Sequence, residues 1–486
     1  MSALQKLFKH TFIYGIATVL PRVLTVLLTR LYTDKLPTDE YGVVNLVFAY
    51  MVFFNVVLSY GMETAFFRFM NKNDNKREVQ ATALTTLLFS SLLFLGLAFP
   101  FRESIADFIN VKTEYISYGI GILFLDALVV IPFAWLRNNE KPLQYSFLKI
   151  FNVIINLSLN LFFFLMLPSL IQSDADHFLN HMYLGEANIT YIFIANFAAS
   201  LITLILLLPL YWKIGLTIKA SILKQMLRYG LPILIAGIAF AINEHFDKIL
   251  LERLLPPAIA KSELGIYSAC YKLGVFMTLF ITAFKLGVEP FFFSNASNKD
   301  AKETYANITL YFTIFAAVIL LGVVVYIDLF KQILIADEAY WEAIIIVPII
   351  LLANLFLGLY HNLSVWYKVT DRTLYGAYIS VFGALVTLTM NFLLIPIIGY
   401  VGSALATLAA YGTMMLTSYL LGQKNYPVPY NLKKIGTYLV LAIGLSALSF
   451  YVFERELIKG TGLLLLFLGF VYFNEKKEIQ KLLLRK

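Results

Sequence analysis

The sequence has 486 residues, of which 60% are hydrophobic, 16% aromatic and 14% charged. Because roughly a quarter of the residues of a soluble domain are charged, this composition indicates an integral membrane protein rather than a soluble one. The single cysteine, Cys270, excludes an intrachain disulfide and a cysteine-bound metal cluster.

Apolar segments fill most of the chain and alternate with short polar turns. A helix that crosses a bilayer needs roughly 20 apolar residues, and by this measure the sequence predicts about 14 spans. No segment resembles a strand-rich soluble domain, so we predict an all-α integral membrane protein. The predicted spans are 10–33, 41–66, 79–100, 114–136, 143–169, 187–212, 228–255, 264–292, 304–330, 342–366, 374–396, 399–422, 434–453 and 460–473.

Lysine and arginine residues gather in alternate loops. With a cytoplasmic N-terminus, most of the 38 basic residues fall in cytoplasmic segments, such as 68–77, 213–228 and 476–486. This bias predicts that both termini are cytoplasmic and that the longest outer loop, near 169–186, is periplasmic. The net charge of +8 is then a feature that faces lipid headgroups of the bilayer, and we predict no nucleic-acid partner.

The chain contains an internal repeat. Leu250–Gly265 aligns without gaps on Leu27–Gly42, so that charged residues and glycines fall in register. Trp135–Leu143 aligns in the same way on Trp366–Leu374, and this second register also carries Asn160 onto Asn391. The sequence therefore predicts a duplicated membrane bundle.

The repeat divides the chain into four parts. Residues 1–213 form a predicted N-lobe of six transmembrane helices, and residues 228–424 form a C-lobe of six. Between them, 214–227 is a basic, amphipathic segment, predicted to lie on the cytoplasmic face. Residues 425–486 supply two additional helices and a basic cytoplasmic tail.

The seventh and eighth predicted spans carry charged residues within the membrane. Glu244, Asp247 and Lys248 share one helix face, and Lys272 on the next span lies at a similar predicted depth. An ionisable group in hydrocarbon costs several kcal/mol, so such residues usually face a bundle interior or a wet cavity. Two interpretations stay open: an ion-pair cluster that holds the hairpin together, or a wet site for an anionic substrate or a coupling cation.

A second group lies near the cytoplasmic edge. Lys285 and Glu289 are four residues apart, and Glu63 occupies the matching position in the first repeat, where Gly61-Met-Glu63 corresponds to Gly287-Val-Glu289. Snorkelling of these side chains to the headgroups is one interpretation. A cytoplasmic gate or a contact between repeats is the other.

Arg22 and Asp126 both lie about midway along their predicted spans. A midplane arginine is expensive, and Asp126 is an acidic residue of matching depth. Either the two form a structural ion pair, or Arg22 contacts an anionic group, since a guanidinium suits phosphate.

Soluble-enzyme motifs do not occur in the sequence: it has no Walker sequence, no Gly-x-Ser-x-Gly and no His-Glu-x-x-His. We therefore predict a protein that is not an enzyme, with no catalytic residue, no metal site and no cofactor.

Several short motifs resemble those of polysaccharide-biosynthesis flippases. They are Asp39-Glu40-Tyr41-Gly42, Tyr229-Gly230-Leu231-Pro232, Asp247-Lys248-x-Leu250-Leu251 and Leu264-Gly265-Ile266-Tyr267-Ser268-Ala269. Their order and spacing, with the span count, extend the resemblance over essentially the whole chain. This family belongs to the multidrug/oligosaccharidyl-lipid/polysaccharide exporter superfamily.

The resemblance implies two six-helix lobes around a central cavity that opens alternately to either side. It also implies a flippase of the bacterial inner membrane that carries an undecaprenyl-pyrophosphate-linked oligosaccharide from the cytoplasmic to the periplasmic leaflet. The glycan would be an O-antigen unit of lipopolysaccharide, a capsule unit or an exopolysaccharide unit. Partners would include a glycan polymerase and other assembly proteins, and transport would be coupled to a proton or sodium gradient.

Under this resemblance the charged residues acquire roles. Arg22, Lys248 and Lys272 are the candidate contacts of the pyrophosphate and glycan. Asp126, Glu244 and Asp247 are the candidate coupling residues or cavity ion pairs, and Glu63, Lys285 and Glu289 form the candidate gate.

Three alternatives remain: a lipid II flippase, a cation-coupled multidrug exporter of the same superfamily, and a polytopic glycan polymerase or ligase. Multidrug exporters usually stop at 12 spans, and polymerases usually have a large outer loop that the spacing of these spans does not provide.

Overall fold

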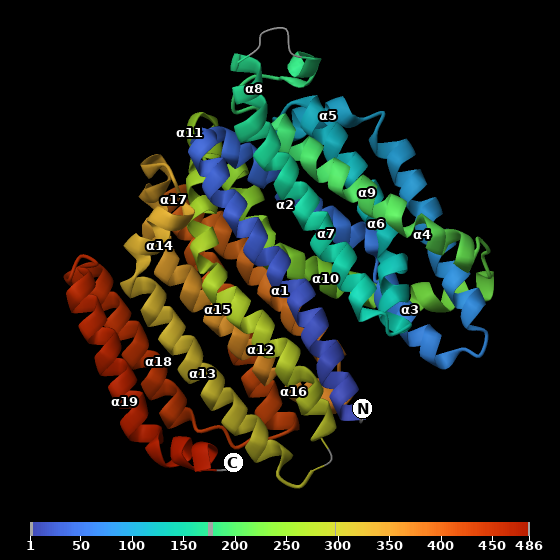
Figure 1. The fold of residues 1–486 in the computed structure, drawn as a ribbon. Coiled ribbons are helices and arrows are strands. Elements are labelled where there is room, and N and C mark those ends of the chain that lie inside the picture. The colour runs from blue at the N-terminus through green and yellow to red at the C-terminus, as the bar shows by residue number, and fades with distance from the viewer. Residues whose placement is uncertain (1–2, 174–177, 297, 485–486) are drawn as a thin grey trace. The chain divides into compact units, whose positions relative to one another are not determined.

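A computed structural model describes residues 3–173, 178–296 and 298–484. Every regular element of these residues is a helix (Figure 1), which confirms the predicted all-α class. The α-helices are α1 Ala3–Lys35, α2 Thr38–Ser59, α3 Met62–Lys72, α4 Lys76–Ala98, α5 Arg102–Ile109, α6 Thr113–Asn138, α7 Pro142–Leu161, α8 Leu167–Ser173, α9 Thr190–Ile214, α10 Ala220–Leu254, α11 Pro257–Tyr271, α12 Val275–Ser294, α13 Ala301–Val325, α14 Ile327–Leu334, α15 Ile346–Leu363, α16 Val365–Val369, α17 Leu374–Asn425, α18 Leu432–Ala447 and α19 Leu457–Leu484.

Short helical turns of other types connect or extend these helices. Of the predicted outer loop 169–186, residues 174–177 lie outside the described residues. The turns are the π-helices η1 Phe162–Met166 and η5 Leu448–Val452 and the 3-10 helices η2 Phe178–Met182, η3 Lys272–Gly274 and η4 Glu338–Ile345.

Twelve helical stretches of the described chain are long and apolar enough to cross a membrane. One of them, α17, supplies two of the predicted spans because it breaks at Ile398 and Gly399. The 33-residue helix α1 contains the first predicted span and is not among the twelve. Together these helices account for the spans that the sequence predicts, and the chain is a multi-pass membrane protein.

The break in α17 follows directly from its sequence. Pro396, two residues before the break, has no backbone N–H to donate to the helix. Gly399 adopts φ +58° and ψ −138°, a conformation that is open to glycine and strained for other residues. The predicted boundary between the spans 374–396 and 399–422 lies at this break.

By packing, the chain forms two compact units, Met1–Ser268 and Ala269–Lys486, called unit 1 and unit 2 below. Helix α10 packs along α2, α3 and α4, so the unit boundary comes later than the predicted lobe boundary at 213–228. The segment predicted as a linker ends in the first two turns of α10. Before that helix, Lys219 pairs with Glu78 of α4 at 2.5 Å. The division into lobes stays a prediction.

In unit 1 the start of α2 packs backbone against backbone on the middle of the repeat-related helix α11. A Cβ atom on Gly42 would lie 1.9 Å from the carbonyl oxygen of Lys261, and one on Gly265 would lie 1.8 Å from that of Thr38. The hydroxyls of Thr38 and Ser262 lie 2.7 Å apart at the same contact. The two glycines that align in the repeat therefore face each other in a reciprocal contact that only glycine permits.

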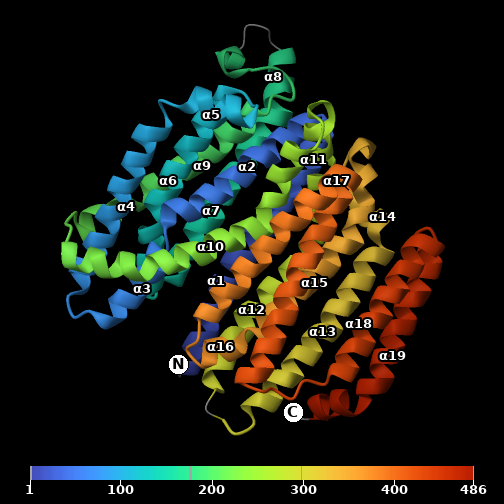
Figure 2. The same ribbon diagram turned by 180° about the vertical axis from the view of Figure 1, so that it is seen from behind.

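Unit 2 is built around α13, α15 and α17. The C-terminal helices α18 and α19 run along α13 (Figure 2), in agreement with the packing of each against it. They are joined by the buried carboxylate of Glu475, which lies 2.7 Å from the Lys434 amine and accepts a hydrogen bond of 2.7 Å from the Tyr438 hydroxyl.

Candidate functional site

Unit 1 contains a polar cavity of about 520 Å³ between α2, α6, α7 and α9. This volume lies within the roughly 300–1,000 Å³ range of ligand pockets. Charged, amide and aromatic side chains all contribute to its lining. Its lining includes Phe48, Asn55, Glu63, Asp126, Phe133, Arg137, Tyr145, Lys149, Asn152, Asn196, Ser200 and Thr203.

The carboxylate of Asp126 lies at the centre of the polar wall, midway along α6. Its Oδ1 atom accepts a hydrogen bond of 2.8 Å from the hydroxyl of Ser200 on α9. Asn55 of α2 hydrogen-bonds it, and Lys149 of α7 interacts with it electrostatically. Three different helices thus converge on one carboxylate, which satisfies a charge that would otherwise be costly at this depth.

Lys149 connects the two acidic residues of the cavity. Its ammonium group interacts with Asp126 and with Glu63, and it lies 4.3 Å from the centroid of the Phe133 ring, within the range of a cation–π contact. The Lys149 ammonium, a compact point charge, is therefore attracted by both carboxylates of the cavity.

Amide and hydroxyl groups extend the polar wall. The Asn152 side chain donates a hydrogen bond of 2.9 Å to the Thr203 hydroxyl, which in turn donates 2.7 Å to the Ala199 carbonyl oxygen. Asn196 lines the same cavity. Amides offer both donors and acceptors, so this wall matches a ligand rich in hydroxyl groups.

An ion pair borders the cavity at the end of α6. The Arg137 Nη1 atom lies 2.8 Å from Glu63 Oε1, and both side chains are nearly half exposed. The guanidinium also lies 5.0 Å from the centroid of the Phe67 ring. The predicted gate residue Glu63 is therefore joined to α6 by an arginine of the same unit.

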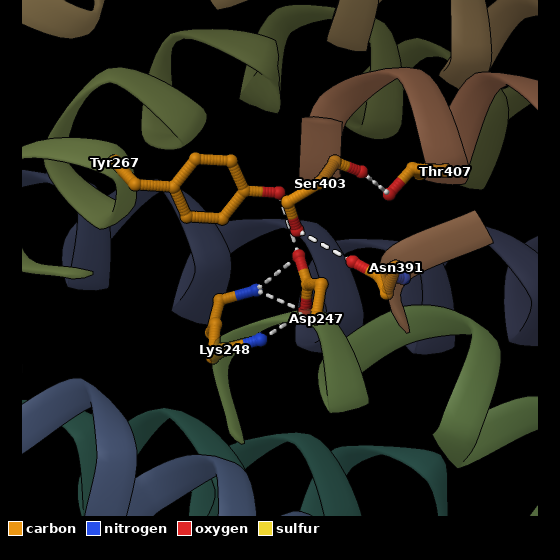
Figure 3. Close-up of polar contacts among 6 residues, drawn as sticks. All are labelled: Asp247, Lys248, Tyr267, Asn391, Ser403 and Thr407. Carbon is orange, nitrogen blue, oxygen red and sulfur yellow. Dashed lines mark hydrogen bonds and ion pairs between the residues drawn. The ribbon is translucent and has the colours of Figure 1, made fainter. Parts of the chain in front are cut away.

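The predicted cluster on α10 contains a buried aspartate, drawn in Figure 3. The Asp247 carboxylate is 3.2 Å from the Lys248 ammonium, and it accepts a hydrogen bond of 2.6 Å from the Tyr267 hydroxyl. Only 2% of the Asp247 side chain is exposed. Asp247 and Lys248 thus pair with each other, and Tyr267 completes the site.

The other predicted residues of this group are less buried than Asp247. Arg22 lies on an exposed position of α1, and Glu244 is half-buried on α10. Lys272 belongs to unit 2, where it is half-buried and begins the turn η3.

In unit 2, Glu289 pairs with Lys368 of α16 at 2.5 Å. Glu289, Lys285 and His361 line a pocket of about 20 Å³, which holds about one water molecule. The sequence alignment had already matched Glu63 with Glu289 and Arg137 with Lys368, so the two repeats contain the same ion pair.

A second repeat-related feature is a pair of buried asparagines. Asn160 of unit 1 donates a hydrogen bond of 2.8 Å to the Asn156 carbonyl oxygen. Asn391 of unit 2 donates one of 2.7 Å to the Thr387 carbonyl oxygen and accepts one of 3.0 Å from the Ser403 hydroxyl (Figure 3). The alignment of Asn160 with Asn391 is therefore matched by the same local contact.

Lys149 is not among the residues predicted from the sequence, because it lies near the start of its predicted span 143–169, close to the basic residues Arg137 and Lys141 of the preceding loop. A signal was nevertheless present. Lys149, Asn152 and Asn156 are spaced three and four residues apart, which places polar groups on one face of an otherwise apolar helix.

The comparison with known families decides the classification. A model described as "Polysaccharide biosynthesis protein" matches residues 4–295, which is more than half of the chain. The chain belongs to the polysaccharide biosynthesis protein family. The predicted resemblance is thereby confirmed. No curated protein matches this polysaccharide biosynthesis family member.

Solved structures of transporters share its fold. The lipid II flippase MurJ, in an inward-closed conformation, matches with a TM-score of 0.72 and 14% identity over 95% of this chain and 99% of its own. An inward-facing multidrug resistance MATE family transporter of the MOP superfamily matches with a TM-score of 0.62 and 14% identity, over 88% and 96%. A MOP superfamily transporter from Pyrococcus furiosus matches with 0.60 and 14%, over 90% and 99%. At this identity the likeness establishes the exporter fold.

Proposed function

We propose that this protein is a flippase that moves a lipid-linked oligosaccharide across the membrane, and that the polar cavity of unit 1 receives part of the glycan. The family match, together with the composition of this cavity, carries the proposal. Sugars are bound by amides and carboxylates that hydrogen-bond hydroxyl groups and by aromatic rings that cover apolar faces. The cavity offers Asn152 and Asn196 for the first role and Phe48 and Tyr145 for the second.

The cationic and acidic residues have different roles in this proposal. Lys149 and Arg137 are cations that suit an acidic sugar or a phosphate near the cavity, and Asp126 and Glu63 keep them neutralised when the cavity is empty of ligand. Arg22, Lys248 and Lys272 stay the proposed contacts of the pyrophosphate, whose lipid tail remains in the bilayer. Their charge suits a polyanion.

We propose further that the protein works by alternating access in the bacterial inner membrane, with both termini in the cytoplasm. Its substrate is an undecaprenyl-pyrophosphate-linked unit of O-antigen, capsule or exopolysaccharide, and transport is coupled to a proton or sodium gradient. Asp126, Glu244 and Asp247 are the proposed coupling residues, and Glu63, Lys285 and Glu289 contribute to the gate. A glycan polymerase is the expected partner on the periplasmic side.

A multidrug exporter of the same fold is the second candidate, favoured by the likeness to MATE transporters. The two functions differ in what the cavity must attract. A cavity for cationic drugs would be expected to hold unneutralised acids, whereas here Lys149 interacts electrostatically with Asp126 and Glu63, and Glu63 is also paired with Arg137.

The test is Lys149→Gln in cells that depend on this chain for surface glycan. We expect surface glycan to fall and the lipid-linked precursor to accumulate on the cytoplasmic leaflet, with unchanged protein in the membrane. Lys141→Gln is the matched control, because Lys141 lies over the Trp135 ring and does not line the cavity. Normal glycan export by Lys149→Gln, with drug resistance altered instead, would overturn the proposal.

A further inference from the structure

Unit 1 has a second cavity, of about 420 Å³, between α2, α4, α5 and α6. Its described lining is apolar apart from Tyr50 and Ser104. Met51 lies in the wall that this cavity shares with the polar one. The volume is near the lower end of the roughly 300–1,000 Å³ range of ligand pockets, which suits one narrow apolar group.

The apolar pocket is bordered by large apolar side chains that are exposed on unit 1. Phe54 and Phe108, which line it, are 40% and 67% exposed, and Leu93 and Leu97 on α4 are 63% and 59% exposed. In a membrane-spanning helix bundle such side chains meet hydrocarbon. Apolar cavities do not hold water well, so the molecules that surround this pocket and match its lining are lipid chains.

The rim carries a guanidinium. Arg253, at the end of α10, donates a hydrogen bond to the Phe108 carbonyl oxygen, and its guanidinium lies 4.3 Å from the centroid of the Phe108 ring. It also hydrogen-bonds Tyr50, a pocket residue, and lies 3.5 Å from the Glu252 carboxylate. An arginine has five N–H donors, so a group that carries phosphate can join these contacts.

We propose that the apolar pocket of unit 1 binds one hydrocarbon chain of a bilayer phospholipid, with Arg253 at the rim contacting the lipid phosphate. The apolar lining accounts for the chain, and the guanidinium beside Phe108 accounts for the headgroup. The bound chain packs against Met51 and so supports the α2 wall that the two cavities share. This lipid is a resident component of unit 1 and is distinct from the transported substrate.

The test uses the full protein in vesicles that contain phosphatidylglycerol with a photoreactive diazirine near the end of its acyl chain. After irradiation, labelled residues are mapped by mass spectrometry. We expect labelling of pocket residues such as Phe94 and Leu123. Exposed residues of α17, such as Phe392, report contact with ordinary bilayer lipid and provide the internal reference.

Gly119→Leu fills the pocket. Gly119 lines it, and a Cβ there lies 3.7 Å from the Met51 sulfur, an ordinary contact, so the added side chain extends into the space. We expect labelling of Phe94 and Leu123 to fall several-fold relative to α17. Gly96→Leu is the matched control, because Gly96 does not line the pocket and has nothing within 4 Å of its added Cβ.

Arg253→Gln tests the headgroup contact and should also lower pocket labelling relative to α17. If Gly119→Leu fails to fold, Ala98→Phe fills the pocket from the α4 wall instead. Wild-type pocket residues that stay unlabelled, or pocket labelling that persists in a folded filled variant, would overturn the proposal. Unchanged labelling in Arg253→Gln would overturn the role of the arginine. None of these outcomes depends on glycan transport.

Discussion

In unit 1 the ion pair Glu63–Arg137 borders a cavity of about 520 Å³, whereas in unit 2 the matching Glu289, paired with Lys368, borders one of about 20 Å³. The aligned positions keep the pair, so the difference arises deeper in each bundle. The two repeats therefore share the ion pair and differ in the size of the cavity beside it.

The side chains around the two cavities differ in charge and in the packing of aromatic rings. In unit 2 the Phe312 ring stacks on Phe280 with centroids 5.3 Å apart and meets Phe284 at 4.9 Å. A Cβ on Gly358 would lie 2.3 Å from the Phe312 ring, so the rings fill the space tightly. When the register of Trp135 and Trp366 is continued, Asp126 falls on Leu357 and Lys149 on Ser380, and the separate register of Glu63 and Glu289 places Asn55 on Ile281. The first repeat, all of which lies in unit 1, is thus the copy that is equipped for a polar ligand.

The largest effect is expected when the unit 1 carboxylate is placed in unit 2. Leu357 is 5% exposed, and Ser380, at the position of Lys149, cannot neutralise a charge. A buried charge without its partner costs about 3–5 kcal/mol. We therefore expect Leu357→Asp to lower the thermal unfolding temperature in detergent strongly, and Leu357→Met, which nearly conserves volume, to change it little.

A Leu357→Asp protein as stable as the wild type would show that the unit 2 site already admits water or a cation. The contrast between the two repeats would then disappear.

A smaller effect is expected at the contact that the repeats share. Gly265→Ala places a Cβ 1.8 Å from the Thr38 carbonyl oxygen, and the backbone must move to admit it. Such overpacking costs about 1–3 kcal/mol. Gly96→Ala, on an open face of α4, should not destabilise the protein. Denaturant unfolding of both variants checks this, and equal stability of the two would contradict the close approach of α2 and α11.

The features that follow from the internal repeat and from the position of a residue along its span could be predicted from the sequence. The aligned glycines Gly42 and Gly265 contact each other, and Asn160 and Asn391 make the same local contact, because residues at equivalent helix positions meet equivalent neighbours. The partners of the aligned Glu63 and Glu289 were not predicted. The span count followed from apolar length. The expected depth of Asp126 also agrees with its place midway along α6.

The contents of the cavities could not be predicted in the same way. Whether a space is open depends on how rings such as Phe312 pack, and the alternation of apolar residues does not encode this. Lys149 lies close in sequence to a basic loop, so its place in the chain does not distinguish it from a residue of that loop. The direction of its side chain depends on the packing of α7 against α9.

Asp126 and Lys149 should stabilise each other in the folded protein. A double-mutant cycle of Asp126→Asn and Lys149→Gln should give a coupling energy of about 1 kcal/mol, near the low end for interacting residues, since the cavity screens the pair. Thermal unfolding of the four proteins measures it. The same cycle with Lys141→Gln should give none, and a zero value for both cycles would mean that Lys149 does not neutralise Asp126 in the folded protein.

The smallest effect on stability is expected from the two ion pairs, and it separates a gate from a structural contact. The Glu63 and Glu289 side chains are 44% and 35% exposed, and exposed pairs contribute roughly 0–1 kcal/mol. Glu63→Gln and Glu289→Gln should therefore unfold at nearly the wild-type temperature. If the pairs hold the bundle closed during transport, both variants should still export less glycan, and Glu63→Arg combined with Arg137→Glu should recover export by restoring the pair in reverse. Unchanged export in both single variants would mean that the retained pairs anchor side chains at the membrane surface, leaving the Asp126 and Lys149 cavity as the feature that distinguishes unit 1.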